Sequence, residues 1–179
     1  MFRFLIIFVT SLLVLFTLDV LTVVEVHLID PFNALLAAIS AKLIGLFGGD
    51  AIAQGKVILS LSTGLAVSIE RVCNGVEAVI ILVSAMIAFP SSWKAKFVGV
   101  VLGTLAIQAL NLVRIISLYY LHQWSSVWFE WFHSYIWQAL IVLDALVMFL
   151  LWLRYLPRLS AAPAPDEPPP GSPPVEAIA

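Results

Sequence analysis

The sequence has 179 residues, of which 62% are apolar and 11% charged, and its mean hydropathy is +1.06. A soluble domain is about half apolar and about a quarter charged, so this chain has too little polar surface for a water-soluble globule. The net charge of −2 argues against a nucleic-acid-binding protein, and a single cysteine excludes an internal disulfide framework and a cysteine-rich metal site.

Four apolar stretches each approach the roughly 20 residues that cross about 30 Å of hydrocarbon as a helix. They cover about residues 2–24, 73–89, 97–121 and 134–153. Because lipid cannot satisfy open backbone groups, we predict an all-α membrane protein built on a bundle of about four transmembrane helices. No small-residue cleavage site follows the first stretch, so we interpret it as an uncleaved anchor rather than a secretory signal.

The segment between the first two spans, residues 19–72, is too long for a simple loop. Residues 31–47 have helical periodicity and few charges, and they predict an extracytoplasmic amphipathic helix that lies in the interface or packs on the bundle. Residues 57–61 and 65–69 are short β-branched runs separated by Ser62-Thr63-Gly64. They predict a small β-hairpin before the second span.

The basic residues favour one orientation. Five of the nine lie before the first span, between the second and third, or after the fourth: Arg3, Lys94, Lys96, Arg154 and Arg158. With an even number of spans these positions share one side, which the positive-inside rule assigns to the cytoplasm. We therefore expect a multi-pass protein of the bacterial cytoplasmic (inner) membrane with both termini in the cytoplasm.

The C-terminal composition differs from that of the membrane domain, which we place at residues 1–159. Residues 160–179 contain seven of the ten prolines and no aromatic residue. This predicts a disordered proline-rich cytoplasmic tail without a functional site.

Three chemically unusual residues fall on the outer side of this topology. Cys73 opens the second span, Arg114 lies seven residues before the outer end of the third, and His133 opens the fourth. Each has a structural alternative: Cys73 as a small buried hydrophobe, Arg114 as a side chain that snorkels to the surface, and His133 as an interfacial anchor. Together they predict one active site that faces the periplasm or exterior.

The three side chains suit acyl transfer through a thioester. Only the thiolate of Cys73 attacks efficiently, and His133 can accept its proton and later protonate the leaving amine. Arg114 does not deprotonate in proteins, so it can stabilise the thiolate or an oxyanion but cannot act as a base.

Other polar residues lie at helical spacing from these three. Glu77 is four residues after Cys73, and Asn111 is three before Arg114, where it could orient a peptide carbonyl or the guanidinium. Asp144 is on the same helix face as His133 but too deep to touch it; it could pair with a residue such as Gln108, and a structural role is equally open.

The other charged residues and histidines do not indicate a second active site or a metal site. Glu70 and Arg71 can pair with each other or with solvent. His27, His122 and His133 are scattered without ligand spacing, so we expect no metal site, and the chemistry requires no cofactor.

Three motifs resemble the exosortase/archaeosortase family over about residues 31–153. They are Cys73-Asn74-Gly75 at the start of a span, Asn111-Leu112-Val113-Arg114 within the next, and His133 at the start of the last. The compact size and the Cys-Asn-Gly-Val-Glu-Ala block are similar to the short form, exosortase H.

The resemblance implies a membrane-embedded cysteine peptidase or transpeptidase with Cys73, Arg114 and His133 as catalytic residues. Asn74, Glu77, Asn111 and Asp144 are then candidates for substrate binding or for support of the site. The implied substrates are exported proteins with a C-terminal sorting signal, which consists of a short motif, a transmembrane helix and a basic tail. An acceptor nucleophile would complete the reaction.

The alternative hypothesis is a non-enzymatic protein. A small membrane transporter or assembly subunit could use Arg114 and Asp144 to line a polar path, since ionisable residues inside a membrane often mark such paths.

Overall fold

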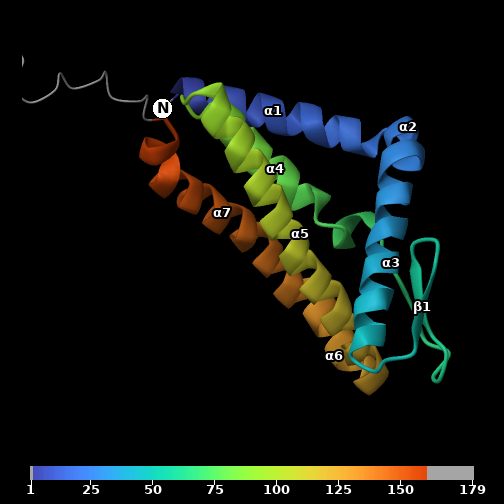
Figure 1. Cartoon of the computed structure of the whole chain (residues 1–179). Helices are drawn as coiled ribbons and strands as arrows, with labels where there is room; N and C mark the ends of the chain where they lie inside the picture. Colours follow the sequence, from blue (N-terminus) through green and yellow to red (C-terminus); the bar gives the residue numbers. More distant parts are fainter. Residues whose placement is uncertain (1, 161–179) are drawn as a thin grey trace, which may run out of the picture.

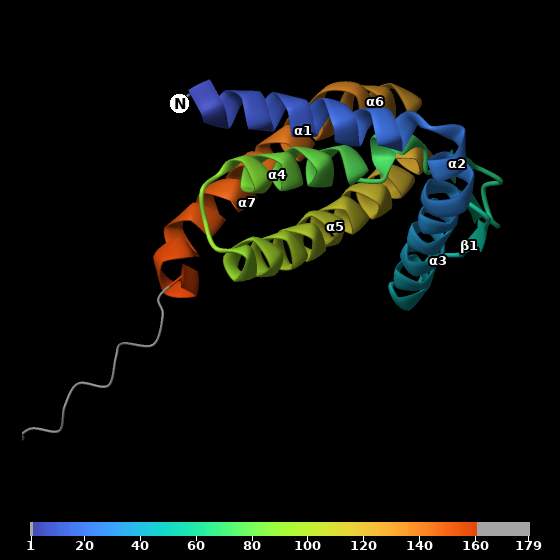
Figure 2. The same ribbon diagram turned by 90° about the horizontal axis from the view of Figure 1, so that it is seen from above.

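The computed structural model describes residues 2–160, and residues 161–179 of the predicted tail lie outside the described residues. Four helices form the bundle: α1 (Phe2–Val20), α4 (Val76–Ala88), α5 (Trp93–Trp124) and α7 (Trp137–Ser160) (Figure 1). Helix α1 packs on α4, and α4 packs on both α5 and α7. The start of α1, the α4–α5 connection and the end of α7 lie at one end of the bundle in both views (Figures 1 and 2), so the three predicted basic regions are neighbours.

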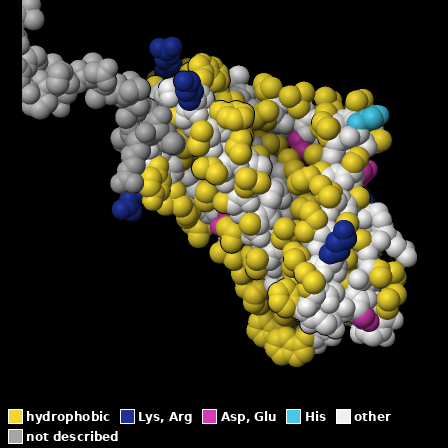
Figure 3. Space-filling view, viewed as in Figure 1, with side chains coloured by type: hydrophobic (Ala, Val, Ile, Leu, Met, Phe, Trp, Pro, Cys, Tyr) yellow, Lys and Arg dark blue, Asp and Glu magenta, His cyan; other side chains and the backbone are white. Residues whose placement is uncertain are grey.

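The helices that are long and apolar enough to cross a membrane differ from the four predicted spans. Among residues 2–160 they are Phe2–Val20, Thr22–Leu46, Trp93–Trp124 and Ser126–Leu156. The predicted second span corresponds to α4, which has only 13 residues and is about 20 Å long. Large apolar side chains cover the outside of the bundle (Figure 3), with Leu13 62% and Phe97 72% exposed. The chain is therefore a multi-pass membrane protein.

The stretch between the third and fourth predicted spans is helical rather than a separate connection. Helix α5 continues to Trp124, and Ser125 separates it from a helical run made of α6 (Ser126–Trp131), the π-helical segment η3 (Phe132–Ile136) and α7. Residues 120–133 contain neither glycine nor proline, so nothing in the sequence interrupts helical hydrogen bonding beyond this one turn.

A bent helical connection leads from α1 to the sheet. It consists of α2 (Thr22–Val24), the π-helical segment η1 (Glu25–Ile29) and α3 (Asp30–Leu46). Pro31 lies in the first turn of α3, where a missing N–H leaves no helical hydrogen bond unmade. In both views α3 runs across the end of the bundle (Figures 1 and 2), and this confirms a helix at the position predicted for residues 31–47.

A three-stranded antiparallel sheet follows, in the order β1 (Ala51–Gln54), β2 (Val57–Ser60) and β3 (Ala66–Ser68). The predicted hairpin is confirmed as β2–β3, with Val57 opposite Ser68, whereas β1 was not predicted. Asp50 accepts hydrogen bonds from the Ser60 hydroxyl at 3.1 Å and from the Tyr119 hydroxyl at 3.4 Å. These bonds tie the sheet to α5.

Two apolar clusters form the core. One joins α3, the sheet and α5 and contains Ile44, Ile58 and Cys73, while the other joins α4, α5 and α7 around Leu82 and Trp152. The candidate site lies where the sheet meets the bundle, because Cys73 belongs to the first cluster and lies next to α4.

Candidate active site

Cys73 lies in a turn that connects the sheet to α4. The turn is the 3-10 segment η2 (Arg71–Cys73), and it is followed by Asn74 and by Gly75, whose φ of +76° favours glycine. The Asn74 side chain accepts a hydrogen bond from the Val76 N–H at 2.9 Å and so satisfies the first backbone N–H of α4. The sequence had predicted that Cys73 opens the helix. In the structure it precedes the helix, in η2.

The structure brings together the three residues that the sequence singled out. The Cys73 Sγ atom lies 3.6 Å from Nδ1 and 3.9 Å from Nε2 of His133, and Nη2 of Arg114 lies 3.9 Å from the same sulfur. Arg114 Nη1 also donates a hydrogen bond to the Val72 carbonyl at 3.1 Å. A thiol, an imidazole and a cation thus converge from η2, η3 and α5.

The surroundings of this cluster are apolar and largely closed to water. Cys73 is 6% exposed and Arg114 is 1% exposed. The half-buried His133 ring stacks on Phe129 with 5.5 Å between centroids, which fixes its orientation towards the sulfur. A cavity of about 30 Å³ opens beside Cys73 and His133, enough for a water molecule but not for a peptide.

Chemically, this arrangement suits a thiol nucleophile. The imidazole is close enough to the sulfur to exchange a proton, and the guanidinium supplies positive charge where water is excluded. Such charge acts more strongly here than it would in bulk water, since the local dielectric constant is lower.

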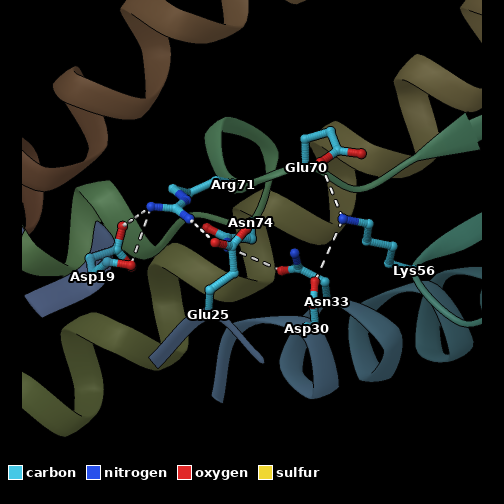
Figure 4. A network of polar contacts seen from close by, with 8 residues as sticks. All are labelled: Asp19, Glu25, Asp30, Asn33, Lys56, Glu70, Arg71 and Asn74. Carbon is cyan, nitrogen blue, oxygen red and sulfur yellow. Dashed lines mark hydrogen bonds and ion pairs between the residues drawn. The ribbon is translucent and has the colours of Figure 1, made fainter. Parts of the chain in front are cut away.

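A network of polar contacts holds the Cys73 turn against the N-terminal helices (Figure 4). Arg71 contacts Glu25 at 2.9 Å through Nη2, and its Nη1 atom donates to the Asp19 carbonyl at 3.2 Å. Asn74 donates to the Asn33 side-chain oxygen at 3.0 Å, and both asparagines are buried. The turn is thus fixed to α1, η1 and α3.

Lys56 extends this network to the start of the turn. Its Nζ atom lies 3.4 Å from Glu70 and 3.5 Å from Asp30. A hydrogen bond from the Ser68 hydroxyl and the proximity of Lys56 hold the pKa of Glu70 below its ordinary value, and Glu70 raises the pKa of Lys56. The suggested pairing of Glu70 with Arg71 is therefore wrong, because each has other partners.

Asn111 lies against the Cys73 turn. It is 3% exposed, and both polar atoms of its side chain lack a hydrogen-bond partner within residues 2–160. A Cβ on Gly75 would lie 3.2 Å from Asn111 Cγ and 3.1 Å from Gln108 Nε2. Two α5 amides therefore face the residue that follows Asn74.

Glu77 and Asp144 form no direct contact with Cys73, Arg114 or His133 among the hydrogen bonds and ion pairs of the described residues. Glu77, in the first turn of α4, and Asp144, in α7, are half-buried, and neither forms an ion pair in the part of the chain described here. The suggested pairing of Asp144 with Gln108 is not found, because no hydrogen bond joins their side chains within residues 2–160; the Gln108 carbonyl oxygen is buried there without a donor.

Sequence reasoning missed the residues that hold the turn: Asp19, Glu25, Asn33 and Lys56. One signal was available. Asp19 is an acidic residue in an otherwise apolar helix, and a buried carboxylate of this kind requires a partner. Its partner Arg71 is 52 residues away in the sequence, so the pairing itself could not be predicted.

Comparison with known proteins identifies one family. A family model described as a transmembrane exosortase matches residues 2–154, so the similarity includes α1 and is longer than the motifs indicated. No curated protein and no solved structure matches the chain.

Proposed function

The chain belongs to the transmembrane exosortase family, and we propose that it is a membrane-embedded cysteine peptidase or transpeptidase acting on C-terminal sorting signals of exported proteins. The observation that carries this proposal is the convergence of Cys73, His133 and Arg114 in a buried pocket. Family membership alone supports a protein-sorting role, and the geometry of these three side chains supports the thiol mechanism.

The proposed reaction begins with transfer of the Cys73 proton to His133. The sulfur then attacks the carbonyl carbon of the scissile peptide bond, and Arg114 stabilises the negative charge that develops. The C–N bond breaks as His133 protonates the leaving amine, which leaves the substrate bound to Cys73 as a thioester. An acceptor nucleophile, or water, attacks this thioester and regenerates the thiol.

Asn111 is the best candidate for a substrate-binding residue. Its buried amide has unused donor and acceptor capacity, and an unpaired buried amide is costly unless a ligand satisfies it. We assign the side-chain N–H group of Asn111 the role of donating a hydrogen bond to a carbonyl of the substrate. Asn74 has a supporting role, because it satisfies the first backbone N–H of α4 and bonds Asn33, and Glu77 and Asp144 remain candidates for support.

The proposed substrate is held in the membrane by its own helix, with a basic tail on the cytoplasmic side. The enzyme would lie in the bacterial cytoplasmic membrane with both termini in the cytoplasm. The clustering of the basic helix ends at one end of the bundle supports this orientation (Figures 1 and 2). The pocket would then open to the periplasm or exterior.

Co-expression with a tagged exported reporter tests the proposal. The reporter carries a short motif, a transmembrane helix and a basic tail at its C-terminus. Cys73→Ala should insert into the membrane at the wild-type level but leave the reporter uncut. Unchanged processing would eliminate the thiol mechanism, and loss of a transport activity in Asp144→Asn alone would favour the transporter hypothesis.

Mass spectrometry of the new reporter C-terminus identifies the acceptor. A free carboxylate indicates hydrolysis, whereas an added group indicates transfer and identifies the nucleophile.

A further inference from the structure

Strand β3 has one free edge. It pairs only with β2 in the described part of the sheet, and its register places Val67 opposite Ile58. The backbone bonds from Ile69 N to Lys56 O and from Ser60 N to Leu65 O, both 2.9 Å, flank this pair. Hydrogen-bonded pairs alternate in an antiparallel ladder, so the N–H and C=O groups of Ala66 and Ser68 point away from β2.

These outward groups are accessible. Ala66 and Ser68 are both exposed, and within residues 2–160 no backbone hydrogen bond joins them to a segment outside the sheet. The side chain of the intervening Val67 packs on the core instead. An unpaired edge of this kind is a template for another strand.

The same strand forms one wall of the cavity at the candidate active site. Val67, Ser68 and Ile69 line it together with Cys73 and His133. The cavity holds about 30 Å³, so a whole peptide does not fit inside it. A chain lying along the outer edge of β3, however, would present one carbonyl to the sulfur at the end of the strand.

We infer that the outer edge of β3 binds the extended peptide next to the scissile bond of the substrate, which joins the sheet as a fourth strand beside Cys73. This inference rests on the proposed function and specifies how its substrate is held. Main-chain hydrogen bonds align the peptide, as in other cases of strand addition. Recognition is then mostly of backbone, so many side chains are accepted at the aligned positions.

The length of the edge identifies the occupant. Three residues offer only two outward-facing positions, too few to hold a second folded copy of the chain, since short two-stranded pairings are marginal in water. They are enough for a peptide that its own transmembrane helix already confines to the membrane, because confinement raises its effective concentration.

Proline substitution removes one outward N–H and leaves the ladder to β2 intact. We expect Ser68→Pro to process the tagged reporter about ten-fold more slowly than Ser68→Ala, which keeps the N–H, because one lost hydrogen bond corresponds to roughly that factor. Ala66→Pro should be slower than Ala66→Gly by a similar factor. The melting temperature in detergent should be similar within each pair, which verifies that the fold is intact.

Equal processing within both pairs would overturn the inference while leaving the proposed function in place, provided that Cys73→Ala remains inactive. Processing by Cys73→Ala would instead defeat the proposed function itself.

A cross-linking experiment avoids any dependence on proline. In a Cys73→Ala background, Ala66→Cys leaves one thiol in the chain, and single cysteines are introduced one at a time upstream of the reporter cleavage site. With diamide as oxidant, we expect disulfides at alternate reporter positions, because side chains alternate along a paired strand. Cross-linking without this alternation, or none at all, would refute strand addition.

Discussion

The Arg114→Lys substitution tests the central charge of the site. The guanidinium of Arg114 uses two nitrogens at once, one 3.1 Å from the Val72 carbonyl and one 3.9 Å from the Cys73 sulfur. Lysine retains the charge but has one nitrogen and no planar fork, so it can keep only one of these contacts. Loss of one preorganised donor to a developing oxyanion costs about 3 kcal/mol, which predicts a fall of roughly 10²- to 10³-fold in kcat.

The measurement is the single-turnover rate of reporter cleavage by purified protein in lipid vesicles. Arg71→Lys is the matched control, because Arg71 holds the same turn through Asp19 and Glu25 and has no contact with the Cys73 sulfur within residues 2–160. Lysine at position 71 keeps the positive charge beside Asp19 and Glu25, so the rate should change by less than about five-fold. An Arg114→Lys rate within about three-fold of wild type would assign Arg114 a purely structural role.

Three further predictions concern the turn. Asn33→Leu should lower the melting temperature in detergent, because it leaves the buried Asn74 amide N–H unpaired at a cost of about 1–3 kcal/mol. An unchanged melting temperature would show that this bond contributes nothing to stability. Gly75→Ala should lower the stability of the fold more than Gly64→Ala. Both glycines have positive φ, but only at Gly75 would the added Cβ lie against the α5 amides. Equal effects on stability would contradict that packing. The lowered pKa of Glu70 stabilises the fold at pH values above 4.5, and this contribution is lost as the pH falls below 4.5. Glu70→Gln should therefore flatten the loss of thermal stability below pH 4.5.

The secondary structure was predictable where a pattern persists over several residues. Helix α3 and the β2–β3 hairpin follow from periodicity, β-branched runs and the turn residues between them. Strand β1 (Ala51–Gln54) was missed because Ala-Ile-Ala-Gln has weak strand preference, and it becomes a strand through pairing with β2 and packing on α3.

The convergence of three side chains was predictable from the sequence, whereas the way in which the helices bring them together was not. Depth arithmetic placed Cys73, Arg114 and His133 on one side, although each lies at a different distance from its helix end than expected. Arg114 is ten residues before the end of α5, and His133 lies inside a continuous helical run. The three side chains still meet because α5 and α6 both extend beyond the predicted ends of their spans. The residues added to α5 after Arg114 and those added to the helical run before His133 keep the two side chains at a similar level.

The contacts that hold the turn depend on long-range packing. Asn33 and Asn74 are 41 residues apart, and no local rule relates them. Their pairing follows only once α3 has crossed the end of the bundle (Figure 1).

The shortness of α4 affects the surrounding lipid. A helix of 13 residues falls about 10 Å short of the hydrocarbon thickness, so the turn at its Cys73 end lies below the headgroups or the bilayer thins to meet it. A turn held below the headgroups lengthens the path over which a peptide bond must be dehydrated to reach the sulfur, whereas a thinner bilayer shortens that path. Hydrophobic mismatch thereby links catalytic rate to acyl-chain length, and vesicles of shorter phospholipids should sustain faster turnover.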